Sequence, residues 1–176
     1  MDRSEALELV NSWTTNKNLV KHMLCVEACM RGLAKHFSAD VELWGMTGLV
    51  HDADYESNPE EHPWVLVKEL EKNQEHSKMI DAIKAHAWQW SQKSPEPKSD
   101  MEWSLYCCDE LSGLIVASAL VLPDRKLKSL TVESVLKKFP NKSFAKGVHR
   151  EHIQLCEEKL GINLPEFVEI CLKSIQ

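Results

Sequence analysis

Four ionisable side chains fall on helix faces that are otherwise apolar, namely His22, His51, His86 and Asp109. His22, for example, precedes Val26 and Leu33 by four and eleven residues, a spacing that points its imidazole toward the core. One such histidine is commonly a hydrogen-bonded core residue. A buried aspartate such as Asp52 or Asp109 is costly unless it is paired or coordinates a cation. Because neutral imidazoles alone do not supply that partner, the pattern favours a bound divalent metal.

The full set in chain order is His22, His51 with Asp52, His62, His86 and Asp109, at intervals of 29, 11, 24 and 23 residues. In this order the chain resembles the HD-domain superfamily of metal-dependent phosphohydrolases, which is known by a His, a later His-Asp dipeptide and a distant Asp. The matching elements are KHMLCVEA, GLVHDADYE and YCCDELSGLIVA, and the histidines of EEHPW and AIKAHAW are similar to those of HD branches with two metals. The closing segment KKFPNKSFAKGVHRE extends the likeness to small stand-alone HD hydrolases.

The resemblance implies a ligand set and a reaction. By the family pattern, a first metal is held by His22, His51, Asp52 and Asp109, and Asp52 bridges to a second held by His62 and His86. Such ligands suit Mn, Fe, Zn or Mg, and the mixture does not choose among them. Two ions can activate a bridging water for in-line attack on phosphorus, with His51 and Asp52 at the reacting centre. With one ion, His62 and His86 become phosphate contacts or proton donors.

The sequence departs from the family after the His-Asp dipeptide. The common HDIGK form is replaced by HDADY, so no role of its lysine carries over to Tyr55. Asp54 or Glu56 is the candidate to act instead, and Asp54 joins His51 and Asp52 as an expected catalytic residue.

Basic residues are concentrated near the carboxyl end of the chain. Residues 123–150 hold eight Lys or Arg against two acids, a balance of +6 within a chain of net charge −6. Such a segment can steer an anionic substrate, or can simply be a solvated surface. Because a guanidinium suits bidentate phosphate binding, we expect Arg150 to bind substrate, together with Lys137 and Lys146.

The tryptophans, the remaining histidines and the cysteines are weaker candidates for functional residues. Four tryptophans can stack a base or, as is commoner at helical spacing, pack in the core: Trp64, Trp88, Trp90 and Trp103. Four histidines fit exposed or helix-end positions: His36, His76, His149 and His152. The H-x-x-H spacing of His149 and His152 is interpreted as incidental. The six cysteines are expected to be core thiols.

Apolar residues recur with a period of 3.6, which predicts an all-α fold. The expected helices are 4–14, 18–37, 40–50, 63–73, 77–90, 100–122, 131–139, 145–160 and 165–174. They predict a single HD-type helical bundle of about seven to nine helices over residues 1–176. Its metal-site core covers about 18–122, and a basic helical segment covers 123–176.

Composition limits the classes of protein that fit. The chain has 176 residues with 43% hydrophobic and 27% charged residues, which excludes collagen-like and disordered chains. Its longest apolar run, LIVASALVL, is far too short to span a bilayer, and MDRSEALELV lacks the pattern of a secretory signal. We therefore expect a cytoplasmic, reduced protein without a membrane partner. The net negative charge makes nucleic acid an improbable partner, and a monomer or homodimer is equally compatible.

The sequence thus predicts a metal-dependent phosphohydrolase acting on a nucleotide or another small phosphorylated metabolite. One alternative is a non-catalytic helical module that binds metal and senses a phosphorylated ligand. Another is a purely structural helical protein, which leaves Asp52 and Asp109 unexplained on apolar faces.

Overall fold

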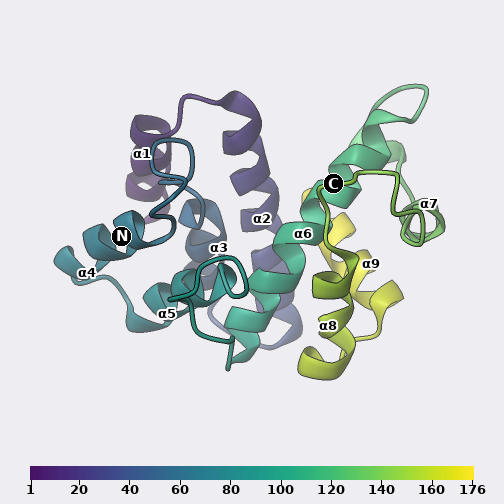
Figure 1. Cartoon of the computed structure of the whole chain (residues 1–176). Helices are drawn as coiled ribbons and strands as arrows, with labels where there is room; N and C mark the ends of the chain where they lie inside the picture. The colour runs from purple at the N-terminus through teal and green to yellow at the C-terminus, as the bar shows by residue number, and fades with distance from the viewer.

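Nine α-helices and one short 3₁₀ helix account for the regular structure of the chain in the computed structural model, which describes residues 1–176 (Figure 1). The helices are α1 (Arg3–Trp13), α2 (Lys17–His36), α3 (Val41–Val50), α4 (Trp64–Lys72), α5 (Ser77–His86), α6 (Asp100–Leu120), η1 (Leu127–Ser129), α7 (Val132–Lys138), α8 (Arg150–Leu160) and α9 (Leu164–Ile175). There is no strand. The predicted all-α, single-domain bundle is confirmed.

Two expected helices differ from the structure at one end. The helix expected over residues 77–90 ends at His86, and Gln89 has a left-handed φ of 72° that a continuing helix does not accommodate. The helix expected from residue 145 begins only at Arg150, because Ala145 has a φ of 47° and the segment before Arg150 is a series of turns. The η1 turn was not expected from the sequence.

Short polar side chains determine where several helices begin. Asp2 accepts hydrogen bonds from the N–H groups of Ser4 and Glu5, and Glu5 accepts one in return from the Asp2 N–H, forming a capping box on α1. At the other end of the chain, Gly161 ends α8 in the left-handed conformation with φ of 69°, as expected from its position. Local sequence thus determines where α1 begins and where α8 ends.

Helices α2 and α6 lie at the centre, with α1, α3, α4 and α5 on one side and α8 and α9 on the other (Figure 1). Helix α3 packs closely on α2 because Gly48 has no side chain at the crossing. A Cβ atom on Gly48 would lie 2.8 Å from the carbonyl oxygen of Val26. This close crossing brings the carboxyl end of α3, where His51 and Asp52 lie, alongside α2.

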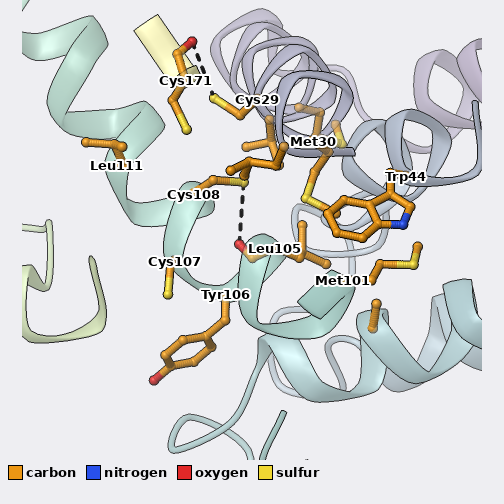
Figure 2. Packing of buried hydrophobic residues seen from close by; sticks show 14 of the residues in the cluster. Cys29, Met30, Trp44, Met101, Leu105, Tyr106, Cys107, Cys108, Leu111 and Cys171 are labelled. Carbon is orange, nitrogen blue, oxygen red and sulfur yellow. Dashed lines mark hydrogen bonds between the residues drawn. The ribbon is translucent and has the colours of Figure 1, made fainter. Parts of the chain in front are cut away.

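A single hydrophobic core of 41 buried residues joins the amino-terminal and carboxyl-terminal helices. Figure 2 shows the sulfur-rich part of it, where Cys29, Cys108 and Cys171 lie together between α2, α6 and α9. The six cysteines are unpaired, and five of them are buried, which confirms those five as core thiols, whereas Cys25 is only partly buried. None of the helices combines the length and the apolar character that crossing a bilayer requires.

Arg150 has a structural role that the sequence did not reveal. Its side chain is 6% exposed, and its guanidinium donates to five backbone carbonyls, those of Phe139, Asn141, Phe144, Ala145 and Val148. These bonds fold the 139–149 segment against the start of α8. Because every N–H of the group is used, the expectation that Arg150 binds a substrate phosphate is wrong.

We predict that Arg150→Ala lowers the free energy of unfolding by about 2–4 kcal/mol, because it leaves several buried carbonyls without donors. Arg150→Lys should recover only part of this, since an ammonium has three donors and no planar fork. Urea denaturation followed by circular dichroism measures the change. Lys137→Ala, an exposed basic residue of the same segment, is the matched control and should stay within about 0.5 kcal/mol of wild type. An Arg150→Ala protein as stable as that control would contradict the assignment.

Candidate metal centre

The structure brings together six residues from five separate segments of the chain. These are His22 on α2, His51 and Asp52 just after α3, His62 in the segment before α4, His86 at the end of α5, and Asp109 on α6. Five of them form two groups that could each hold a metal ion and that share the Asp52 carboxylate, and Asp109 lies beside the first group.

The first group surrounds one oxygen of Asp52. The Nε2 atoms of His22 and His51 lie 3.6 and 3.5 Å from Asp52 Oδ2, and 2.9 and 3.5 Å from Asp109 Oδ1. Atoms that bind a common ion at 2.0–2.2 Å lie roughly 2.8–3.6 Å from one another. His22, His51 and Asp52 therefore have the spacing of ligands to a single ion, and Asp109 lies against the two histidines of this group.

The second group surrounds the other oxygen of the same carboxylate. Asp52 Oδ1 lies 3.4 Å from His62 Nε2 and 3.5 Å from His86 Nε2, and these two nitrogens are 3.0 Å apart. Asp52 thus divides its two oxygens between two pairs of imidazoles. This is the arrangement of a carboxylate that bridges two cations.

All four imidazoles are oriented by a hydrogen bond at Nδ1. His51 Nδ1 lies 2.8 Å from the Gly48 carbonyl oxygen and His86 Nδ1 lies 2.6 Å from that of Ile83. A carbonyl only accepts, so Nδ1 carries the proton and Nε2 is turned toward the carboxylates. Such an outer hydrogen bond is what holds a metal-binding histidine in place.

His22 is held by a hydroxyl relay from α6. The hydroxyl of Ser112 donates to the Asp109 carbonyl oxygen at 2.8 Å, and therefore accepts from His22 Nδ1 at 3.1 Å. Ser112 thus orients the His22 imidazole and connects it to the backbone of α6 at Asp109.

Asp54 orients His62. It is fully buried, and its carboxylate accepts from His62 Nδ1 at 2.6 Å and from the Leu66 N–H at 2.9 Å. It is therefore a positioning residue, and the expectation that Asp54 is catalytic is wrong. Glu56 is also engaged elsewhere, because it accepts from the Thr15 hydroxyl and the Asn16 N–H near the start of α2.

Two features of this arrangement test whether a metal fits. The Nε2 atom of His51 is buried without a hydrogen-bond partner. The Nε2 atoms of His62 and His86 face each other at 3.0 Å although both rings carry their proton at Nδ1, so two lone pairs meet unless a cation or proton lies between them. A cation on each side of Asp52 satisfies all of these atoms, and the residues fit the metal that the sequence led us to expect.

The charges of the group are strongly coupled. Burial disfavours the charged form of His51, but the carboxylates of Asp52 and Asp109 outweigh burial and raise its pKa to about 9. Burial likewise opposes ionisation of Asp109, yet the nearby imidazoles of His22 and His51 hold its pKa well below the usual range. The pKa of His86 is lowered, chiefly by burial. Without metal, a proton on His51 therefore balances part of the carboxylate charge.

A cavity of about 320 Å³ opens onto five of these residues, His22, Asp52, His62, His86 and Asp109. Its volume is at the lower end of the range for small-ligand sites. No lysine or arginine lines it. Lys137 and Lys146 are exposed outside the cavity wall, although Lys146 is followed by Gly147, which does line it. The structure thus does not bring the predicted cationic residues to the candidate ligands.

Aromatic residues lie at the mouth of the cavity. Trp90 is 61% exposed and Tyr55 is 37% exposed, and both line the wall. Trp88 and Trp103 instead pack edge to face with ring centroids 5.7 Å apart, and the Trp64 indole donates to the Ser91 hydroxyl. Of the four tryptophans, Trp90 alone is placed to contact a bound molecule.

Sequence reasoning missed three residues of the cavity wall. Glu110 follows Asp109 on α6, His152 lies on α8, and the buried Tyr106 hydroxyl has no hydrogen-bond partner. His152 lies in the first turn of α8, a helix-end position as expected, but it is buried at 8% exposed, and His149 occupies the N-cap position of the same helix. The H-x-x-H spacing and the acidic residue after Asp109 were the available signals.

Comparison with protein-family models, with curated proteins and with solved structures finds no match for this chain. The likeness to the HD superfamily therefore stays a prediction. The case for a metal rests on the geometry of the six side chains.

We predict that Mn²⁺ affinity rises with pH between about 6.5 and 9 and that binding releases protons. The reason is that the ion must displace the proton from His51, whose pKa is about 9 in the metal-free state. Calorimetry of the chelator-treated protein, under argon and in buffers of different ionisation enthalpy, measures both quantities. His76→Gln, which changes an exposed histidine away from the site, should behave as wild type. Affinity that is constant over this range would contradict the coupling.

We also predict that Asp54→Asn weakens binding of one of two metal equivalents by about 10–100-fold, because His62 loses its orienting carboxylate. The other equivalent, on the side of His22 and His51, should bind nearly as in wild type. Glu56→Gln is the control, since Glu56 lies two residues away and touches none of the candidate ligands. Equal weakening of both equivalents would instead indicate a general structural defect.

Proposed function

We propose that this protein is a metal-dependent phosphohydrolase that cleaves a phosphoester or phosphoanhydride bond of a small phosphorylated molecule, with a nucleotide as the first candidate. The observation that carries the proposal is Asp52, whose two oxygens face two separate pairs of imidazoles. A bridging carboxylate of this kind is typical of two-metal sites that hydrolyse phosphates. The order of the ligands along the chain and its resemblance to HD hydrolases support the same interpretation.

When bound, two divalent ions lower the pKa of a water molecule and stabilise the entering and leaving oxygens of an in-line displacement. The residues of the chain hold and orient the site for this chemistry. Asp52 and Asp109 supply the negative charge that retains cations, and the four imidazoles present Nε2 because each Nδ1 is already bonded. The side chains thus need little rearrangement on binding.

Other residues of the cavity suit the substrate. Trp90 and Tyr55 flank the mouth and offer flat faces against which a base can stack. The small cavity favours a substrate whose phosphate enters while the rest of the molecule stays at the mouth.

We predict that wild-type protein with Mn²⁺ releases phosphate from at least one member of a panel of nucleotides, dinucleoside polyphosphates and sugar phosphates. Asp52→Asn should lose at least about 10³-fold in kcat/KM on the same substrate, because it removes the shared carboxylate, and should keep its helix content. Asp81→Asn, an exposed acid on α5, is the matched control and should retain full activity. Metal content is measured for each protein in parallel. Unchanged turnover in Asp52→Asn would overturn the mechanism, and metal-filled protein without turnover on any substrate would favour the non-catalytic module.

A further inference from the structure

A third group of metal-binding side chains lies on the same cavity wall, outside the six residues already described. It consists of Glu110 on α6 and of His149 and His152 at the start of α8. Glu110 Oε1 lies 2.9 Å from His149 Nδ1 and 3.7 Å from His152 Nδ1. Both imidazoles therefore direct the same ring nitrogen at one carboxylate oxygen.

His152 is the member whose position needs an explanation. His152 is 8% exposed, yet neither of its ring nitrogens makes a hydrogen bond with a protein atom. A separation of 3.7 Å from Glu110 is too long for a hydrogen bond. It is close to the spacing of two ligands on a common ion, which is roughly 2.8–3.6 Å. A nearly buried imidazole aimed at a carboxylate from this distance is suited to share a cation with it.

The three side chains are held in place by their surroundings. The backbone N–H of His149 donates to Glu110 Oε2 at 2.9 Å, which fixes the carboxylate at the start of α8. The two imidazoles stack with ring centroids 5.0 Å apart and an interplanar angle of 28°. The Tyr106 ring also packs against His152, with the two ring centroids 4.8 Å apart. The cluster is thus preorganised rather than assembled from mobile surface groups.

We propose that Glu110, His149 and His152 form a third cation site, of the class that takes a zinc-like transition metal. Two imidazoles and one carboxylate are the donor set of zinc sites that keep a fourth position open. Glu110 and His152 line the cavity, so an ion held by them would border the same space as five of the six candidate ligands. Binding of the ion at this site does not depend on the proposed reaction.

The site has a consequence for ligand binding that does rest on the proposed function. Three carboxylates line the cavity, those of Asp52, Asp109 and Glu110, and no lysine or arginine does. An anionic substrate therefore meets positive charge there only from bound cations or protonated imidazoles. A third cation at Glu110 extends that positive charge along the wall, toward a second phosphate of the same molecule.

Metal binding to the full-length chain tests the proposal directly. Chelator-treated protein is titrated with Co²⁺, whose visible bands report tetrahedral coordination by nitrogen and oxygen, and bound metal is counted after desalting. Glu110→Gln and His152→Asn should each lose one equivalent or weaken it by about 10–100-fold. His36→Asn, an exposed histidine on α2, should match wild type. The Asp52→Asn protein should keep this equivalent, so failure of the proposed hydrolase and failure of this site give different results.

A measurement on unaltered protein protects the test from folding defects in the variants. In histidine-selective NMR spectra, addition of Zn²⁺ should shift the imidazole signals of His149 and His152 as well as those of the four histidines around Asp52. If only those four histidines respond, or if wild type, Glu110→Gln and His152→Asn bind equal amounts of Co²⁺ with equal affinity, the third site does not exist.

Discussion

The arrangement of Asp52 and Asp109 among four imidazoles is the constraint from which the rest of the site follows. Burial of carboxylates is unfavourable unless positive charge comes with them, and no lysine or arginine lines the cavity beside them. In the metal-free protein, a proton on His51 supplies part of that charge, which is why its pKa is raised to about 9. One proton balances only part of two carboxylates. Divalent cations balance both, and they also use the nitrogen lone pairs that the fold turns toward the carboxylates.

The helical scaffold makes this arrangement possible with ordinary local structure. The close crossing of α2 and α3 at Gly48 brings the segments that carry His22 and His51 alongside each other. The carbonyl groups that orient His51 and His86 are those of Gly48 and Ile83, each three residues earlier at the end of a helix. These carbonyls lack partners within their own helices. A histidine placed at a helix end thus satisfies a free carbonyl and presents its other nitrogen to a ligand.

The sequence predicted the elements and the residues whose behaviour depends on local pattern. All nine helices follow from the 3.6 period, and His22, His86 and Asp109 were recognisable because they interrupt apolar helix faces. Arg150 and His152 were misjudged for a different reason. Their environments depend on how residues 139–149 fold back and on how α8 packs against α6. Neither contact produces a periodic pattern in the sequence. Asp54 was misassigned because a carboxylate beside a His-Asp pair has the same local sequence whether it reacts or orients a histidine.

The positions of the positive charges determine which groups could bind an anionic ligand directly. The basic residues of 123–150 suggested direct phosphate contacts, but the guanidinium of Arg150 is committed to backbone carbonyls. Exposed lysines act on an approaching anion through a field that falls off over about 8 Å at physiological ionic strength. Such a field raises the encounter rate without fixing the orientation of the ligand. Inside the cavity, orientation would come from groups at fixed positions, such as the proposed cations beside Asp52 and Glu110. Specificity for a phosphorylated ligand would then depend on which of these proposed sites are filled.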